Sequence, residues 1–295
     1  MKITNRILKK SGIKFFILIL CLFERNIYSK SQFTDVGNGV QIYSEFYENL
    51  EVKFKGTIIF ENGSGTDLSE WTKNKEFFQC VQKQGSLFLY DRNGIGKSSP
   101  DFNQSALNPV TAKFIGDKLF ILLQNNHIKM PYIIVSHSYG GMYAGYFSLK
   151  NPNLIAGMLM VDPVPKNFHF SDKIMKEYES NITLTKTSSS KEIYKKINGA
   201  AAEVAYQLLG FEKSKQEVKN LGNINNHIPV VIVSSNGMEK EKPLIGDWFE
   251  QQKQWLNKNS QSKIFQVNTG HFIQLEEPYA ICDQIKNILK TENNK

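Results

Sequence analysis

The chain has 295 residues, enough for one large α/β domain or two small ones with a substantial buried core. Its formal net charge is +8, but residues 1–30 hold seven of the basic residues and one acid, so the remainder carries only +2. Later residues contain no dense basic stripe with interleaved aromatics. The basic composition therefore gives no support for nucleic-acid binding, and we expect no nucleic-acid partner.

The N-terminal segment has the layout of an export signal. Five basic residues within the first 14 positions precede an uninterrupted apolar stretch at 15–23, and polar residues dominate from 24 to 32. Nine apolar residues are too few to cross a bilayer comfortably as a permanent helix. We expect residues 1–30 to be a secretory signal and the protein to be exported, to a periplasm or outside the cell. An uncleaved N-terminal anchor is the alternative and would be the sole membrane contact.

The rest of the chain alternates between strand and helix patterns. Residues 33–37 and 40–47 predict an edge hairpin around Gly37-Asn38-Gly39. Further strands are expected at 57–60, 87–90, 132–135, 157–161, 229–233 and 264–267, and helices at 68–84, 110–128, 142–147, 248–256 and 278–289. This alternation predicts an α/β fold with a mostly parallel central sheet and helices on both faces.

Residues 164–226 interrupt the alternation. They are rich in Lys, Ser and Asn, contain helical stretches near 173–178 and 200–209, and include no convincing strand. We expect them to form a helical cap inserted into one core made of residues 31–163 and 227–295, because the strands on both sides of the insertion need each other to build one sheet.

Two cysteines, Cys80 and Cys282, follow the predicted signal, each within a predicted helix. The sequence favours two buried free thiols, which pack as small apolar side chains. A disulfide is the alternative in an oxidising compartment, provided that the two helices lie side by side.

The S-H-S-Y-G-G sequence at 136–141 narrows the chemistry most. It follows the strand at 132–135 directly and leads into a helix. A small-x-Ser-x-Gly turn in this setting is a nucleophile elbow, which exposes the serine hydroxyl at a strained backbone position and requires small residues at 136 and 140. Ser138 is therefore the candidate nucleophile.

A serine hydroxyl needs a base within hydrogen-bond reach, and that base needs an acid to orient it. His271 is the best-placed of the five histidines because it follows the last strand, at the edge where parallel sheets collect their active sites. The side chain of His137 is expected to point away from its neighbour Ser138. The other three histidines lie at helix ends or in the insertion: His127, His169 and His227.

Four segments together resemble the α/β-hydrolase superfamily, over nearly all of the chain after residue 30. They are F-E-N-G-S-G at 60–65, Y-D-R-N-G-I-G-K-S at 90–98, the 136–141 elbow and G-H-F-I-Q-L-E-E-P at 270–278. The first is similar to the superfamily's His-Gly oxyanion loop, with Glu61 and Asn62 replacing the usual histidine as in a bacterial E-x-G-x-G subgroup. The resemblance implies an oxyanion hole made by the backbone N–H groups of Tyr139 and Ser64.

The triad acid stays open between two positions. In most of the superfamily it follows the strand that corresponds to 230–233, but the loop here reads S-S-N-G-M-E at 234–239. The strand at 157–161, which Asp162 follows, is the other location that the resemblance allows. We favour Asp162, with Glu239 as the alternative acid. Two further carboxylates rank behind them: Glu241 and Asp247.

The 90–98 turn is interpreted as structural. Its glycines allow a tight bend, and we expect Asp91 and Arg92 to tie loops together.

The predicted reaction is a two-step acyl transfer that needs no metal and no cofactor. The expected substrate is a small molecule, a carboxylic ester or thioester of small to medium size. The serine nucleophile argues against the epoxide hydrolases and haloalkane dehalogenases that the resemblance also includes, since these use Asp. An amidase or iminopeptidase with the same triad and a catalytically silent binding protein are the alternatives. The sequence does not specify the oligomeric state.

Overall fold

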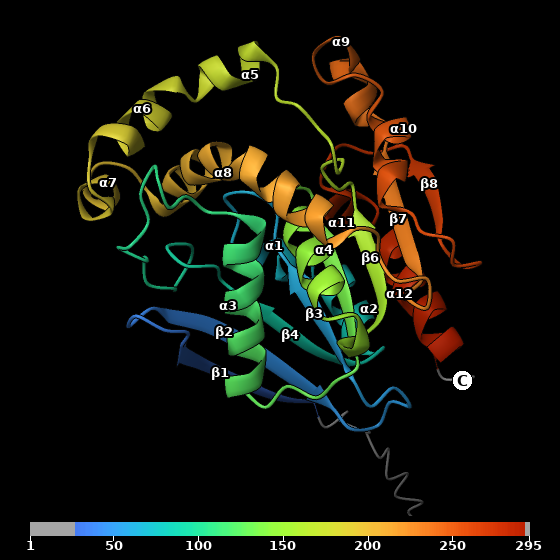
Figure 1. Ribbon diagram of the computed structural model, residues 1–295. Helices are drawn as coiled ribbons and strands as arrows, with labels where there is room; N and C mark the ends of the chain where they lie inside the picture. The colour runs from blue at the N-terminus through green and yellow to red at the C-terminus, as the bar shows by residue number, and fades with distance from the viewer. Residues whose placement is uncertain (1–26, 293–295) are drawn as a thin grey trace, which may run out of the picture.

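An eight-stranded sheet with helices on both faces makes up the centre of the computed structural model, which describes residues 27–292 (Figure 1). The strand order is β1-β2-β4-β3-β5-β6-β7-β8. Strand β2 runs antiparallel to both its neighbours, and the other neighbouring pairs are parallel. The strands are β1 (Ile27–Asp35), β2 (Gln41–Asn49), β3 (Thr57–Glu61), β4 (Ser86–Tyr90), β5 (Tyr132–His137), β6 (Ile155–Val161), β7 (Val230–Ser235) and β8 (Lys263–Val267). The predicted α/β class is confirmed.

Successive apolar side chains of each central strand enter different cores. In β3, Ile58 and Phe60 pack on one face and Ile59 on the other, and all three are fully buried. One face is covered by α3 (Ala112–Asn125), α4 (Gly140–Lys150) and α8 (Gly199–Leu221). The opposite face is covered by α1 (Ser69–Thr72), α2 (Lys75–Gln82), α11 (Ile273–Glu276) and α12 (Pro278–Glu292). Nearly continuous apolar strands such as β5 and β6 fold this way because both of their faces are covered.

The first strand begins before the predicted end of the signal segment. Residues 1–26, which include the predicted basic and apolar parts of the signal, lie outside the described residues. Residues 27–30 belong to β1 and pair with β2, for example Tyr28 with Glu48 and Lys30 with Phe46. The expected boundary at residue 30 therefore falls inside a strand.

The predicted helix at 68–84 is two helices. Helix α1 ends at Thr72, and Asn74 then adopts an extended conformation as the N-cap of α2. Its side chain accepts a hydrogen bond from the Phe77 N–H at 3.0 Å and donates one to the Leu275 carbonyl at 3.0 Å. Asparagine at a cap competes with helix continuation, which explains the break.

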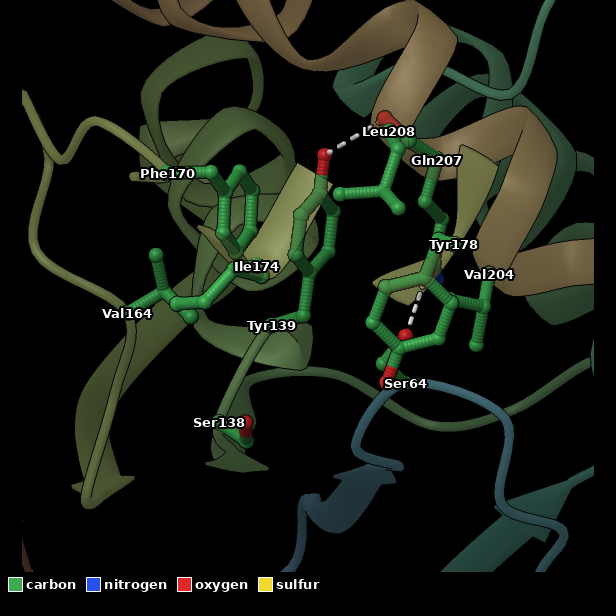
Figure 2. Close-up of a pocket in the computed structure, with 10 residues that line it drawn as sticks. All are labelled: Ser64, Ser138, Tyr139, Val164, Phe170, Ile174, Tyr178, Val204, Gln207 and Leu208. Carbon is green, nitrogen blue, oxygen red and sulfur yellow. Dashed lines mark hydrogen bonds between the residues drawn. The ribbon is translucent and has the colours of Figure 1, made fainter. Parts of the chain in front are cut away.

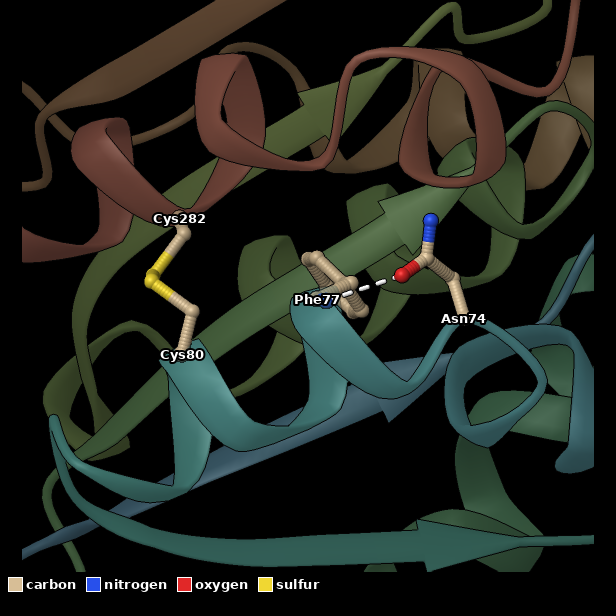
Figure 3. Close-up of a disulfide and its surroundings, with 4 residues drawn as sticks. All are labelled: Asn74, Phe77, Cys80 and Cys282. Atoms are coloured by element: carbon tan, nitrogen blue, oxygen red, sulfur yellow. Dashed lines mark hydrogen bonds between the residues drawn. A yellow bond between two sulfur atoms is a disulfide. The ribbon is translucent and has the colours of Figure 1, made fainter.

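A disulfide joins α2 to α12 on one face of the sheet (Figure 3). Cys80 and Cys282 are bonded, with their Cα atoms 6.2 Å apart. The preference for two free thiols is wrong, because the two helices that cover this face lie side by side and bring residues 202 positions apart within bonding range.

The stretch between β6 and β7 contains helices and no strand. It comprises α5 (Asp172–Glu177), α6 (Glu179–Thr187), α7 (Ser190–Lys196) and the long α8. In Figure 1, α5 to α7 arch beyond α8, which lies against α4 and α3. Short helices α9 (Lys242–Ile245) and α10 (Trp248–Gln252) follow β7. Among residues 27–292, no helix combines the length and apolarity that a membrane crossing requires.

Candidate active site

Ser138 occupies a sharp turn between β5 and α4. Its backbone φ is +51°, a left-handed conformation that costs energy for a residue with a side chain. The turn is held on both sides, since the Ser138 N–H donates to the Val161 carbonyl and the Ser138 carbonyl accepts from the Val164 N–H, each at 3.0 Å. A Cβ at Gly140 would lie 2.4 Å from the Asn62 carbonyl oxygen. The elbow therefore requires glycine there, as the sequence pattern predicts.

His271 lies between Ser138 and Asp162. Its Nε2 is 2.8 Å from the Ser138 Oγ, and its Nδ1 is 2.7 Å from the Asp162 Oδ2. His271 is on the loop after β8, and Asp162 directly follows β6, so the carboxyl ends of three strands meet at one edge of the sheet. Serine, imidazole and carboxylate in this order form one hydrogen-bonded chain, an arrangement that can activate a serine hydroxyl as a nucleophile.

Asp162 is fully buried and its carboxylate has several donors. Besides His271, it accepts hydrogen bonds from the Ser235 N–H and hydroxyl, the Trp248 indole and the Gln252 amide. Burial acts to raise the pKa of Asp162, but His271 and the other donors outweigh it and hold the pKa below its ordinary value. The group at this position is therefore an ionised carboxylate fixed in orientation from several sides.

The alternative acid lies elsewhere. Glu239 is exposed on the short 3₁₀ turn after β7, and its Oε1 accepts a hydrogen bond from the Gln266 side chain at 3.1 Å. Asp247 caps the start of α10 and ion-pairs with Lys242. Of the candidate acids, Asp162 is the one in contact with His271.

The loop at residues 61–65 faces the elbow with one amide left open. The N–H groups of Gly63 and Gly65 donate to the carboxylates of Glu70 and Glu203, each at 2.8 Å. Within the described residues, no acceptor takes the N–H of Ser64, which lies between them, or that of Tyr139, which follows Ser138. These are the two amides that the sequence predicts for an oxyanion hole.

A cavity of about 210 Å³ opens above Ser138, with Ser64 and Tyr139 on its wall (Figure 2). Six apolar side chains line it: Val164, Phe170, Ile174, Tyr178, Val204 and Leu208. None of the residues that line this cavity carries a formal charge. All six of these apolar side chains come from residues 164–226, the segment predicted as a cap.

No family model matches the sequence. The chain is 29% identical over 226 residues to an uncharacterised protein, YqjL, of Bacillus subtilis (strain 168), which covers 76% of this chain and 80% of that protein. Among solved structures it resembles Cfl2 from Burkholderia cenocepacia, with a TM-score of 0.64, 15% identity and coverage of 88% and 96% of the two chains. Haloalkane dehalogenase DbeA from Bradyrhizobium elkani USDA94 aligns with a TM-score of 0.63, 14% identity and coverage of 90% and 100%. The chain has the α/β-hydrolase fold.

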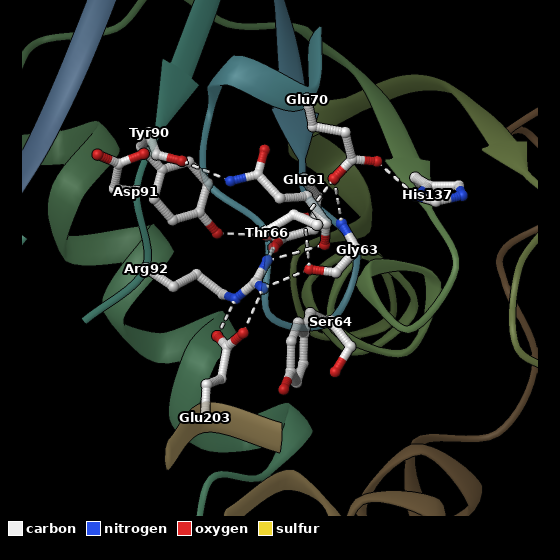
Figure 4. A network of polar contacts seen from close by, with 12 residues as sticks. Glu61, Gly63, Ser64, Thr66, Glu70, Tyr90, Asp91, Arg92, His137 and Glu203 are labelled. Atoms are coloured by element: carbon white, nitrogen blue, oxygen red, sulfur yellow. Dashed lines mark hydrogen bonds and ion pairs between the residues drawn. The ribbon is translucent and has the colours of Figure 1, made fainter. Parts of the chain in front are cut away.

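A buried arginine organises the 61–65 loop (Figure 4). Arg92 ion-pairs with Glu61 and Glu203, and it donates to the backbone carbonyls of Asn62 and Gly63. Asp91 and Arg92 tie loops together, as expected, but they do so through different partners. Asp91 accepts from backbone N–H groups of its neighbouring loops, because adjacent side chains in this turn point in different directions.

A second buried ion pair lies behind the hydrogen-bonded chain of Ser138, His271 and Asp162. His137 ion-pairs with Glu70 through its Nδ1, and its Nε2 is 2.9 Å from the backbone carbonyl of His271. His137 thus points away from Ser138, as expected, but toward a partner that the sequence did not reveal. Glu70 and Glu203 were both missed, since each acts on residues far from its own position and no local pattern marks it. The available signal for Glu70 was its own position, in the first helical turn after the 61–65 loop.

Proposed function

We propose that this protein is a serine hydrolase that cleaves a carboxylic ester or thioester through an acyl-serine intermediate. The observation that carries the proposal is the unbroken chain from Ser138 Oγ to His271 Nε2 at 2.8 Å and from His271 Nδ1 to Asp162 at 2.7 Å. A serine in a strained turn, hydrogen-bonded to an imidazole that a buried carboxylate orients, is the arrangement that activates a hydroxyl for acyl transfer.

The reaction begins when His271 Nε2 takes the Ser138 proton while the Oγ bonds to the substrate carbonyl carbon. The carbonyl oxygen becomes an oxyanion facing the open N–H groups of Ser64 and Tyr139. His271 then gives the proton to the departing alcohol or thiol, which leaves an acyl-serine. A water molecule, deprotonated by His271, attacks this ester, and the carboxylic acid leaves as Ser138 recovers its proton.

The cavity supports an uncharged, mainly apolar acyl group of modest size. Its volume of about 210 Å³ is below the usual range for drug-sized ligands, which begins near 300 Å³. The absence of charged side chains among its lining residues disfavours a substrate with a carboxylate or phosphate on the acyl part, since burying an unpaired charge there would be costly. Straight or singly branched acyl chains fit these requirements.

A fluorophosphonate probe tests the nucleophile without knowledge of the substrate. We expect the folded wild type to be labelled once, at Ser138, and the Ser138→Ala variant to remain unlabelled. Ser180→Ala is the matched control, because this serine is exposed on α6 and does not line the cavity, so its loss should leave labelling intact. A folded wild type that resists the probe would instead favour a binding protein.

Substrate panels then separate the reaction classes. Hydrolysis of p-nitrophenyl esters and of matched thioesters, with little release from anilides or N-terminal proline peptides, is the expected result. Preference for the amides would replace the ester assignment with the amidase alternative while keeping the same three residues.

We further propose that the protein is exported. The support is the basic-then-apolar start of the sequence together with the Cys80–Cys282 disulfide, since disulfides persist mainly in oxidising compartments. Mass spectrometry of the N-terminus of the protein recovered from a native host, by cell fraction, tests this proposal. Recovery of a reduced, full-length chain from the cytoplasm would contradict it.

A further inference from the structure

The cap reaches the 61–65 loop directly through α8. Glu203, in the second turn of this helix, is buried with 2% of its surface exposed. Its Oε2 accepts the Gly65 N–H at 2.8 Å and an Arg92 Nη2 hydrogen at 2.8 Å, while its Oε1 accepts from Arg92 Nε at 2.5 Å. One cap carboxylate therefore contacts both the loop and the arginine that holds the loop. Figure 4 shows its pairing with Arg92.

Arg92 completes the support from the core side. It donates to the carbonyl of Asn62 at 2.8 Å and to that of Gly63 at 2.6 Å. With the Gly63 and Gly65 amides committed to Glu70 and Glu203, the Ser64 N–H is left as the free donor of this turn among the described residues. Arg92 is fully buried, so it needs its carboxylate partners to stay in this position.

The start of α8 packs so tightly against the core that the helix can hold the 61–65 loop in place. A Cβ at Gly199 would lie 1.7 Å from the Gly94 carbonyl oxygen, so the helix touches the turn after β4 with no room for a side chain. One turn beyond Glu203, Gln207 accepts a hydrogen bond from the Ser64 hydroxyl. Residues four apart lie on the same side of a helix, so Glu203 and Gln207 form one row that faces the loop.

We propose that Glu203 is a positioning residue through which the cap helix α8 aims the Ser64 N–H at the substrate oxyanion. The proposal rests on the serine hydrolase function proposed above. Glu203 touches neither substrate nor the reacting atoms. It acts by fixing Gly65 and Arg92, and its loss would let the 61–65 loop turn its open amide away from the oxyanion while the substrate cavity persists.

The test compares Glu203→Ala and Glu203→Gln with Glu217→Ala. Glu217 is a matched control on the same helix, because its Oε2 also accepts a backbone N–H of the core, that of Lys113 at 2.8 Å, but at the far end of α8 from the loop. The glutamine variant keeps an acceptor for Gly65 and removes the charge that opposes Arg92. All variants are first compared by circular dichroism and thermal unfolding.

For Glu203→Ala we expect kcat on a p-nitrophenyl ester and the fluorophosphonate labelling rate to fall about 10- to 100-fold. KM should change less than about threefold, because a misdirected oxyanion donor weakens binding of the transition state rather than of the ground state. The kcat and labelling rate of Glu203→Gln should lie between those of Glu203→Ala and the wild type, and those of Glu217→Ala should stay within about twofold of the wild type. Hydrogen exchange of the 61–66 peptide should accelerate in Glu203→Ala and not in Glu217→Ala.

Unchanged loop exchange in Glu203→Ala would overturn the proposal, and so would faster exchange with unaltered kcat and labelling. Equal losses in Glu203→Ala and Glu217→Ala would also overturn it, because they would indicate general cap destabilisation. A wild type that neither labels nor turns over esters would count against the proposed function instead, and the exchange comparison would still decide whether Glu203 holds the loop.

Discussion

Asp162 and His271 are 109 positions apart, and the Asp162 Oδ2 lies 2.7 Å from the His271 Nδ1. Replacing the carboxylate by an amide removes its charge and presents an N–H₂ donor or a neutral oxygen to the imidazole. We expect Asp162→Asn to lower kcat for ester hydrolysis about 10³- to 10⁴-fold, because the imidazole loses its productive tautomer and its counter-charge.

Glu239→Gln is the companion variant for this prediction. Its carboxylate contacts Gln266, so kcat should stay within about twofold of the wild type. Initial rates on a p-nitrophenyl ester, measured for both variants, show which carboxylate orients His271. A large loss in Glu239→Gln with a small one in Asp162→Asn would transfer the acid role to the other loop.

The Glu70–His137 pair should give the fold a stability that depends on pH. Burial raises the pKa of Glu70, but the charge and hydrogen bonds of His137 outweigh it and the pKa falls below 4.5. Its contribution is therefore present above pH 4.5 and lost as the pH falls through the folded pKa. Burial lowers the pKa of His137, but Glu70 outweighs it and the pKa rises above 6.5, so this contribution is present below pH 6.5 and lost as the pH rises through the folded pKa.

The two contributions overlap between pH 4.5 and 6.5. In that window Glu70→Gln should reduce the free energy of unfolding by about 3 kcal/mol, because it leaves a buried imidazolium without its partner, and the difference should shrink at higher pH. Urea unfolding of the wild type and of Glu70→Gln at several pH values measures this difference in free energy. Glu76→Gln, an exposed change on α2, should show no such window. A pH-independent difference would mean that the pair is not ionised.

Enlarging the cavity should move the preference for acyl length. Ile174 lines the cavity from α5, and Ile174→Ala removes three carbon atoms from its wall. We expect kcat/KM for an ester two carbons longer than the wild-type optimum to rise about tenfold relative to the acetate, since one methylene in an apolar pocket changes discrimination by 10-fold or more.

Ile121→Ala is the control for the cavity change. This side chain is 37% exposed on α3 and does not line the cavity. A graded series of p-nitrophenyl esters gives both profiles. The acyl assignment of the cavity would be contradicted if Ile174→Ala left the length profile unchanged or if Ile121→Ala shifted it equally.

Removing the disulfide should lower stability without altering the site. The Cys80–Cys282 bond closes a loop over 202 positions, for which chain-entropy estimates reach about 5 kcal/mol and typical losses are about 2 to 5 kcal/mol. We expect the double variant Cys80→Ser/Cys282→Ser to unfold at a lower temperature and to be insensitive to reductant, whereas the wild type loses stability when reduced. Equal melting temperatures with and without reductant in the wild type would show that the bond does not form.

Local patterns in the sequence were sufficient for most of the fold. Apolar β-prone runs predict the central strands to within a few residues, and the Ser138 turn is readable because only small residues fit it. The choice between Asp162 and Glu239 was left open, since which strand end supplies a carboxylate to His271 is decided by tertiary packing. The break at Asn74 was hidden by the helical periodicity around it, although asparagine at a cap was visible.

Contacts between distant polar and charged residues were beyond sequence reasoning. Arg92 reaches Glu203 across 111 positions, and Gln274 reaches Glu70 across 204. A single sequence marks neither pair, because a buried glutamate on a helix has the same letter pattern as a solvated one. Burial is what turns these side chains into partners, and burial is known only once the helices have packed.

Neighbouring residues of the cap helix α8 contact two different parts of the site. Glu203 and Gln207 hydrogen-bond the loop beside the elbow, while Val204 and Leu208, one position further along in each case, line the cavity together with Gln207. Under the proposed function, selectivity and turnover are therefore inherited together on α8. In directed evolution, substitutions along this helix that widen the range of accepted substrates should also alter kcat for all of them. A cap transplanted from a relative should work only when it includes a residue that pairs with Arg92 as Glu203 does.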